Sequence, residues 1–595
     1  MRWTSVVLSI LLLCLMAVVW VLVSPYVVSL RSVNPTNDLA TTLVHLLLSA
    51  KVSNPVTQTT TWVLFALMGA ACLVARIHIS LPRRTTYGSS HYATWRETWP
   101  FSRRRQRRVK KTRRRTTPQS VSPESRFVIG KYRWQTIALT EKQQEEQVMI
   151  TGPNGSGKSS QLLIPSLLCE QGSRSLFIAD LKNELFSVTA GTVARSHQVW
   201  LLAPTRPGES HGYNPLAHIR SAADANLFAR CWVKNTGESK EPYWASNAQL
   251  LITAAVLHLR TAEPNAPFSR LNELLTEQPF EELEELLSKS PSVAARKKAG
   301  TFLDNMKRNE RLIGSIMTDI GNRFQIFDGE GVTEVTATNE IDFEVMIDVP
   351  TALYLSIPRS ETELHQPLLA CFTTQMFRSW ERRGVLPRGI ACYLDEFANL
   401  GYIPKFESFI STARYLHVAL LIAIQSASQL DDVYGRDAAK TIKNNANTHI
   451  VFPGVGLEET KYYSERIGEA TVQTESTTQR EEASGRSSTQ SETKRPLMTP
   501  DEIRTMPKRT VLVVPSSSAP MRVRTKPYFE DGRLARQANI PYRLVHVRQP
   551  PPFSSQASQG HAPAAEQPGP IIVDADQGKK DEQDEDRKHF IWESE

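Results

Sequence analysis

Cysteine is scarce in this chain of 595 residues, which contains only six. None of them forms a C-x-x-C pair or stands near a histidine at the spacing of metal ligands, so the pattern indicates reduced core thiols and excludes a structural zinc site. The chain also lacks an H-E-x-x-H motif and a Leu-Ser-Gly-Gly-Gln motif. These absences exclude a zinc protease of the AAA+ kind and a transport ATPase of the ABC kind.

Charge is distributed unevenly behind a modest formal net charge of +9. Between Arg83 and Arg115 there are thirteen lysines and arginines against one acid, Glu97, whereas the chain from Asp574 onward is mostly acidic. The densest part, Arg103 to Arg115, has two explanations: contact with anionic lipid beside a membrane, or contact with nucleic acid. The length predicts roughly three to four domains.

Two apolar segments near the start predict a membrane anchor. Thr4 to Val23 carries no charge and is long enough to cross about 30 Å of hydrocarbon. A cleaved signal peptide is the alternative, but it would end in small residues, which this segment does not. Thr60 to Ala75 is a shorter candidate, with a buried amphipathic helix as its alternative. The loop between them contains few basic residues and the sequence after Leu81 contains many, so we expect both termini in the cytoplasm.

A phosphate loop is complete in the sequence Gly-Pro-Asn-Gly-Ser-Gly-Lys-Ser at 152–159. The apolar run Gln147 to Thr151 predicts a strand before it, and Ser160 to Leu168 predicts a helix after it. In such loops the backbone N–H groups cradle phosphate, Lys158 reaches the β- and γ-phosphates, and the Ser159 hydroxyl binds Mg²⁺. The expected cofactors are therefore ATP and Mg²⁺. The residues expected to bind the nucleotide are Gly152, Pro153, Asn154, Gly155, Ser156, Gly157, Lys158, Ser159 and Ser160.

The chain from about Phe127 alternates apolar strand-like runs with helical patterns, which predicts an α/β fold with a parallel sheet covered on both faces. Strand signals vanish between 216 and 324 and helical periodicity replaces them, so an all-α domain is expected there as an insertion. The runs expected as strands are Ser175–Asp180, Val199–Ala203, Ala352–Ile357, Ile390–Leu394, Ala419–Ile424 and Val511–Val514.

A second nucleotide motif follows the apolar run Ile390 to Leu394. Asp395 is expected to hold Mg²⁺ through water, and Glu396 to polarise the attacking water. Lys158 and Asp395 are 237 residues apart, more than a minimal phosphate-loop core needs, and the helical insertion accounts for the excess.

Two further residues near this motif are candidates for catalysis. Gln425 ends the next expected strand, where it is placed either to sense the γ-phosphate or to cap the strand. Arg414 precedes that strand and is either an arginine finger for a neighbouring subunit's ATP or a surface arginine.

Several short motifs in one order resemble those of the type IV coupling proteins of the TraG/TraD class. The resemblance covers the chain from the two apolar segments to about Asp531. The motifs are Asp180–Glu184, Tyr213–Leu216, Leu394–Gly401, Ser411–Arg414, Ile424–Leu430 with Tyr434-Gly435, and Leu497–Ile503.

This resemblance implies a RecA-like P-loop ATPase of the bacterial inner membrane, working as a homohexamer with its motor in the cytoplasm. The partners that it implies are single-stranded DNA, a relaxase or other relaxosome proteins, protein effectors, and the components of a type IV secretion channel. It implies that the helical insertion recruits substrate. It assigns Lys158 and Ser159 to phosphate and Mg²⁺, Asp395 and Glu396 to Mg²⁺ and water, Gln425 to the γ-phosphate, and Arg414 to a neighbour's site.

The expected organisation combines these patterns. It comprises a membrane anchor at 1–80 with two transmembrane helices and an external loop at 31–59, a basic juxtamembrane segment at 81–126, a nucleotide-binding domain in two parts at 127–215 and 325–545, the all-α insertion at 216–324, a mobile loop at 471–493, and a disordered acidic tail at 546–595.

The sequence departs from the family pattern in three places. The basic run at 103–115 is heavier than expected, Gly88 to Ala93 stands where a Gly-Ser-Ala type segment is expected, and the acidic tail is not a general family feature. The tail is either a solubilising end or a docking motif tipped by Phe590 to Trp592.

An FtsK-like translocase of double-stranded DNA is one alternative function, but it needs a C-terminal winged-helix module that this tail cannot supply. A coupling ATPase for protein effectors alone is another. A scaffold with a degenerate site is disfavoured because the catalytic residues are intact.

Overall fold

The computed structural model describes residues 88–94, 97–101, 127–133, 135–237, 242–306, 310–479 and 486–543. Contacts divide the chain into two units, one of residues 1–89 with 471–493, and one of residues 90–470 with 494–595. The expected transmembrane helices, the basic run at 103–115 and the acidic tail lie outside the described residues. Within the described ranges, no helix combines the length and the hydropathy needed to cross a membrane.

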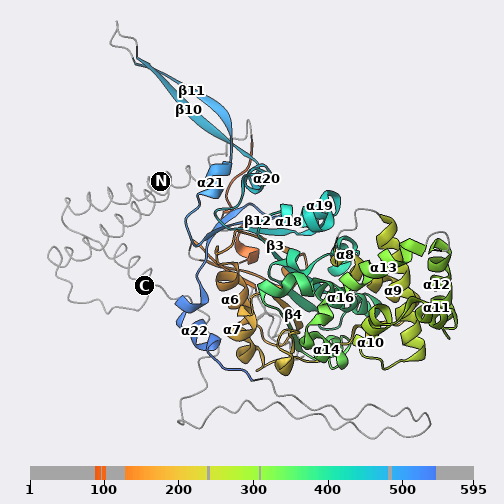
Figure 1. The fold of residues 1–595 in the computed structure, drawn as a ribbon. Coiled ribbons are helices and arrows are strands. Elements are labelled where there is room, and N and C mark those ends of the chain that lie inside the picture. The colour runs from red at the N-terminus through yellow and green to blue at the C-terminus, as the bar shows by residue number, and fades with distance from the viewer. Residues whose placement is uncertain are drawn as a thin grey trace, which may run out of the picture. The chain divides into compact units, whose positions relative to one another are not determined.

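The second unit is built on one sheet of eleven strands, in the order β2-β1-β13-β12-β9-β3-β8-β7-β4-β6-β5 (Figure 1). The strands are β1 (Phe127–Tyr132), β2 (Gln135–Leu139), β3 (Val148–Thr151), β4 (Ser175–Asp180), β5 (Gln198–Leu202), β6 (Thr351–Ser356), β7 (Ile390–Leu394), β8 (Val418–Ile424), β9 (Thr448–Val451), β12 (Thr510–Pro515) and β13 (Met521–Arg524).

The seven strands from β9 to β5 are mutually parallel, as the continuous apolar runs predict. Every residue of β4, β7 and β8 is buried, because helices cover both faces. The expectation of a parallel strand at Val511 to Val514 is wrong in direction: β12 runs antiparallel to β9 and begins an antiparallel extension through β13, β1 and β2. β13 alternates buried and exposed residues, which is typical of an antiparallel strand with one open face.

Alternating side chains of each central strand enter two separate hydrophobic cores. One core joins Ile178 and Tyr393 with α6 (Ile164–Leu167) and α7 (Glu184–Val193). The other joins Phe177 and Leu394 with α16 (Thr362–Arg383) and α17 (Phe406–Ala413). The remaining short helices of this unit are α5 (Glu141–Gln144), α18 (Ser428–Tyr434), α19 (Arg436–Asn445), α20 (Leu457–Ile467), α21 (Pro500–Arg504) and α22 (Gly532–Ala538).

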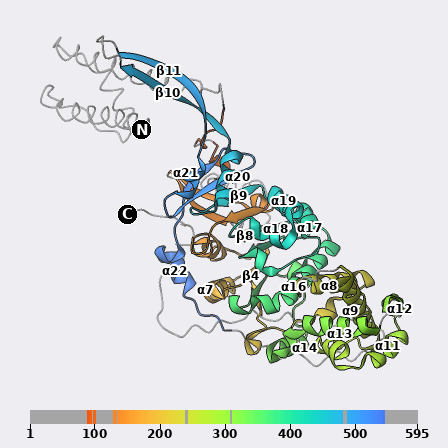
Figure 2. The same ribbon diagram turned by 45° about the horizontal axis from the view of Figure 1, so that its top comes forward.

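A helical insertion separates β5 from β6, and in Figures 1 and 2 its helices lie together, away from α22. It consists of α8 (Ala222–Asn235), α9 (Pro242–Ala262), α10 (Ser269–Asn272), α11 (Phe280–Ser288), α12 (Val293–Met306), α13 (Glu310–Arg323), α14 (Glu330–Ala337) and α15 (Val345–Asp348). Helices thus continue to Asp348, beyond the expected boundary at 324.

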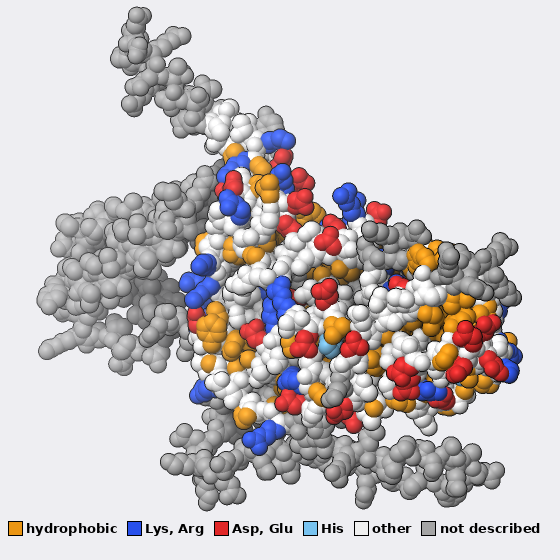
Figure 3. Space-filling model, in the orientation of Figure 1, with side chains coloured by type: hydrophobic (Ala, Val, Ile, Leu, Met, Phe, Trp, Pro, Cys, Tyr) orange, Lys and Arg blue, Asp and Glu red, His pale blue; other side chains and the backbone are white. Residues whose placement is uncertain are grey.

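The insertion has an aromatic centre that joins it to the rest of the unit. The Trp232 ring contacts Phe268 and Phe324, and its Nε1 donates to the carbonyl of Arg323 at 3.1 Å. These side chains belong to the same hydrophobic core as α16, so the insertion is packed on the sheet's covering helix. On the face drawn in Figure 3, acidic side chains gather over the insertion, where α11 has the sequence Phe-Glu-Glu-Leu-Glu-Glu-Leu-Leu-Ser.

Where a loop was expected at 471–493, the described residues form two strands, β10 (Glu469–Gln479) and β11 (Arg486–Pro496), which pair as a separate two-stranded sheet. Threonine favours strands, and pairing the two strands satisfies the hydrogen-bonding groups of their backbones without an apolar core. The Thr474 and Ser491 hydroxyls lie 2.8 Å apart across the pair. Composition alone indicated the absence of a core, which is compatible with a ribbon as well as with a loop.

Candidate active site

The carboxyl ends of the parallel strands meet at one edge of the sheet, which is where α/β proteins bind ligands. The phosphate loop leaves β3 there, and its first amide, Gly152 N–H, donates to the carbonyl of Ile424 at the end of β8 at 3.1 Å. Asp395 and Glu396 follow β7, which pairs with β8. The topology therefore brings both sequence motifs to the same edge.

The phosphate loop depends on glycine at defined positions. Gly155 and Gly157 have φ angles of +72° and +91°. A Cβ on Gly157 would lie 2.0 Å from Gln161 Nε2, so only glycine fits without rearrangement. The expected helix after the loop begins as a wide π turn, Ser159–Leu163, and continues as α6.

Lys158 is folded back into the loop and is only 4% exposed. Its Nζ donates to the carbonyls of Gly152 at 2.6 Å and Pro153 at 3.2 Å. Burial is the main cause that lowers the Lys158 pKa, and the nearby Lys182 adds to it while Asp395 opposes it. Because burial disfavours the charged form of this lysine, an anion such as a phosphate group bound beside Nζ would stabilise the charged form.

Asp395 links β7 to the phosphate loop. The Ser159 hydroxyl donates to Asp395 Oδ2 at 2.9 Å. The Asp395 side chain is buried, and this burial raises the pKa of its carboxyl. Its other oxygen, Oδ1, and the Ser156 hydroxyl are buried without a hydrogen-bond partner among the residues that the structure describes.

These oxygens fit a nucleotide with Mg²⁺. Hydroxyl and carboxylate oxygens are the ligands that Mg²⁺ prefers, and it is usually held by one or two carboxylates together with substrate phosphates. In the described part of the chain no three His, Cys, Asp or Glu side chains cluster as a metal site.

Glu396 lies beside Asp395, and three side chains contact its carboxylate. It is 2% exposed and has a left-handed φ of +55°. Lys182 Nζ lies 2.7 Å from Oε1, Asn399 Nδ2 donates to Oε2 at 3.0 Å, and Gln425 Nε2 donates to Oε1 at 3.4 Å. The structure therefore places the predicted residues Glu396 and Gln425 in contact with each other.

Arg414 is not part of this constellation. It precedes β8, whereas Gln425 follows it, and the strand spans roughly 20 Å at about 3.3 Å per residue. The Arg414 side chain is 64% exposed and pairs with Glu146 at 3.0 Å, at the amino end of β3. Arg414 therefore lies at the amino ends of the strands, away from its own subunit's phosphate loop, and its role as an arginine finger for a neighbouring subunit's ATP stays a prediction.

Sequence reasoning missed a role for Lys182. It lies in the segment Asp180–Glu184 after β4, which the sequence marks only as one of the motifs that resemble the family. Asp180 accepts the amides of Glu184 at 3.0 Å and Phe186 at 2.8 Å and so caps α7, while burial raises its pKa to about 6. The sequence shows only that Lys182 is a cation placed just after an apolar strand; that this strand is the neighbour of the one before Asp395 and Glu396 is known only from the fold.

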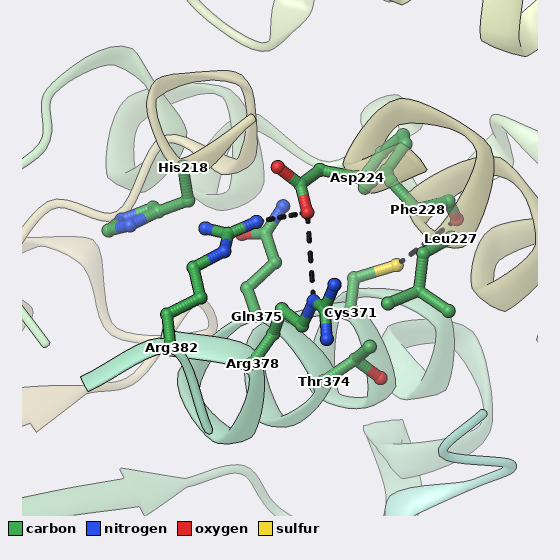
Figure 4. A pocket seen from close by; sticks show the side chains of 9 residues that line it. All are labelled: His218, Asp224, Leu227, Phe228, Cys371, Thr374, Gln375, Arg378 and Arg382. Atoms are coloured by element: carbon green, nitrogen blue, oxygen red, sulfur yellow. Dashed lines mark hydrogen bonds and ion pairs between the residues drawn. The ribbon is translucent and has the colours of Figure 1, made fainter. Parts of the chain in front are cut away.

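A small cavity lies between α8 and α16, away from this site (Figure 4). Its volume is about 10 Å³, and the buried Asp224 beside it forms ion pairs with Arg378 and Arg382 of α16. This space suits at most a water molecule, so the cavity is not a nucleotide site.

Comparisons with known proteins agree with this geometry. The family model described as "Type IV secretory system Conjugative DNA transfer" matches residues 101–560. Protein VirD4 of Rhizobium rhizogenes is 24% identical over 68% of this chain and 61% of its own length, and conjugal transfer protein TraG of Escherichia coli is 24% identical over 61% and 62%. The chain therefore spans about three fifths of the length of these relatives.

The fold is shared with a solved structure, the plasmid coupling protein TrwB in complex with the ATP analogue ADPNP. The TM-score is 0.55, with 18% identity over 75% of this chain and 96% of that one. The structure of TrwB with ADP and Mg²⁺ gives a TM-score of 0.52, with 18% identity over 69% and 95% of the two chains. The extent of the family match decides the identification: this chain belongs to the type IV secretory system conjugative DNA transfer family.

Proposed function

We propose that this chain is an ATPase that drives substrate into a type IV secretion channel during conjugation, with relaxase-bound single-stranded DNA, protein effectors or both as its cargo. The observation that carries the proposal is the contact of Ser159 with Asp395, whose second oxygen is buried beside Glu396 without a hydrogen-bond partner among the described residues. Family membership supports the assignment to conjugative transfer. The TrwB complexes with ADPNP and with ADP and Mg²⁺ support a nucleotide with Mg²⁺ as the ligand.

The residues divide the work of hydrolysis. The amides of the phosphate loop and Lys158 bind the phosphates, and Ser159 and Asp395 would hold Mg²⁺, which supplies positive charge to the phosphate oxygens when bound. Glu396 orients the attacking water and withdraws its proton, and Gln425 lies where a polar side chain can respond to the γ-phosphate.

Assembly as a homohexamer accounts for the position of Arg414. A finger at the sheet edge opposite its own phosphate loop is useful only if it faces the nucleotide of another subunit. In this proposal the motor and both termini lie in the cytoplasm, and the segments at 4–23 and 60–75 anchor the ring in the bacterial inner membrane.

DNA binding by the full-length chain in detergent tests the cargo. We expect a labelled single-stranded oligonucleotide to bind without strong sequence preference, to raise the ATPase rate, and to lose affinity steeply as salt rises, because several phosphate contacts release counterions together. Fluorescence anisotropy across a salt series and ATPase rates with and without DNA measure this. A strong preference for double-stranded DNA would favour an FtsK-like translocase. No DNA affinity or stimulation at low salt would leave a coupling ATPase for protein effectors.

A further inference from the structure

Among the residues that the structure describes, Lys182 is the one that forms an ion pair with Glu396. The two side chains are 2.7 Å apart, and Glu396 is 2% exposed while Lys182 is 32% exposed. Lys182 also interacts electrostatically with Asp395 and Glu184. Burial by itself lowers the pKa of Lys182, but the hydrogen bond to Glu396 and these negative charges outweigh it, so the net shift is upward.

The segment that presents Lys182 is fixed at several points. Asn183 has a left-handed φ of +56°, and its Oδ1 accepts from Ser356 Oγ at 3.0 Å and from Arg206 at 3.0 Å. Asp180, on the other side of Lys182, is held by the amides that begin α7. The lysine therefore extends from a short loop tied to β6, to α7 and to the chain that leaves β5.

Glu396 needs such a partner because its other contacts are weaker. Asn399 and Gln425 offer neutral amides, and the Gln425 contact is long at 3.4 Å. Charge-assisted hydrogen bonds are roughly twice as strong as neutral ones. The neighbouring Asp395 carries the same charge as Glu396 and repels it. Without Lys182, the orientation of the Glu396 carboxylate would rest on two neutral contacts against that repulsion.

We propose that Lys182 is a positioning residue for ATP hydrolysis, which fixes the Glu396 carboxylate toward the phosphate loop and makes the loop after β4 a third component of the active site. This inference rests on the proposed ATPase function. It requires that Lys182 act through Glu396, so its removal slows turnover and leaves nucleotide binding in place, since the phosphate loop and Lys158 are untouched.

The test compares four full-length proteins: wild type, Lys182→Met, Lys182→Arg and the control Lys142→Met, which removes an exposed lysine on α5. We expect Lys182→Met to lower kcat by about 10- to 100-fold, the usual loss when a supporting partner of an active-site group is removed. The KM for ATP and the affinity for a fluorescent ATP analogue should stay at wild-type levels. Lys182→Arg should recover most of kcat because it restores the cation, and Lys142→Met should match wild type.

A double variant separates positioning from general damage. In the Glu396→Gln protein, Lys182→Met should cause no further loss of the residual rate, because the group that Lys182 positions is already disabled. Thermal unfolding of each variant checks that the fold persists, and Lys182→Arg supplies the comparison if Lys182→Met does not fold.

Several results would overturn the inference. They are a wild-type or raised kcat in Lys182→Met, a loss of ATP affinity, an additive loss in the Glu396→Gln background, or failure of Lys182→Arg to recover activity. A wild-type protein that binds ATP and never hydrolyses it would instead overturn the proposed function, and the inference with it.

Discussion

Replacing Arg414 by alanine should stop ATP hydrolysis without unfolding the subunit or preventing nucleotide binding. The exposed pair of Arg414 with Glu146 contributes at most about 1 kcal/mol to stability, because solvent screens it. Loss of an arginine finger, in contrast, lowers kcat by about 10³- to 10⁵-fold. Because Arg414 stands at the edge opposite its own phosphate loop, the loss should be repairable by another subunit.

The expected recovery of activity can be calculated for mixed assemblies of Arg414→Ala and Lys158→Ala subunits. In an equal random mixture, half of the subunits carry an intact phosphate loop and half of the neighbours carry an intact finger, so about one site in four is complete. Coexpressed subunits should therefore recover roughly a quarter of wild-type turnover in a steady-state ATPase assay. Pairing Arg414→Ala with the Lys158→Ala, Arg414→Ala double variant is the matched control and should give no recovery. Mixed assemblies that remain inactive at every ratio would refute a role for Arg414 at a neighbour's site.

Three further predictions concern the basic run, the phosphate loop and the core. Deleting 103–115 should weaken single-stranded DNA binding moderately and reduce its salt dependence if this run contacts phosphate; unchanged anisotropy would assign the run to lipid and topology. Gly157→Ala should lower ATP affinity by at least about tenfold, because its φ of +91° disfavours alanine and the new Cβ meets Gln161; wild-type affinity in an analogue titration would contradict this. Arg174→Met should lower the free energy of unfolding by about 3–5 kcal/mol, because Glu170 then keeps a buried charge without its cation, and urea unfolding with an unchanged midpoint would refute it.

The strands β3 to β8 were predictable because each is a continuous apolar run that must be buried on both faces. Ser175–Asp180 and Ile390–Leu394 match β4 and β7 residue for residue. β1 and β9 were not expected, since the first is interrupted by Gly130 and Lys131 and the second is only four residues long. Such strands form because neighbours provide hydrogen-bond partners, which local pattern does not reveal. The ribbon of β10 and β11 escaped prediction for the same reason.

The residues of the site were predictable where they lie next to one another in the sequence. Lys158 and Ser159 belong to one loop, and Asp395 and Glu396 follow one strand, so motif spacing identifies them. Lys182 could not be assigned, because its contact with Glu396 exists only when β4 and β7 are adjacent in the sheet. The order of strands is a tertiary property. Arg414 and Gln425, by contrast, stand at opposite ends of β8 because one precedes the strand and the other follows it, which the sequence already indicates.

The central claim is that Glu396 drives ATP hydrolysis at a site that Lys158 builds. The most direct measurement pairs analogue binding with ATP turnover for wild type, Lys158→Ala and Glu396→Gln. The account predicts that Lys158→Ala loses nucleotide binding, whereas Glu396→Gln binds as wild type does and turns over at least about 10²-fold more slowly, because only the group that activates water is changed. Wild-type turnover by the Glu396→Gln protein would contradict the account.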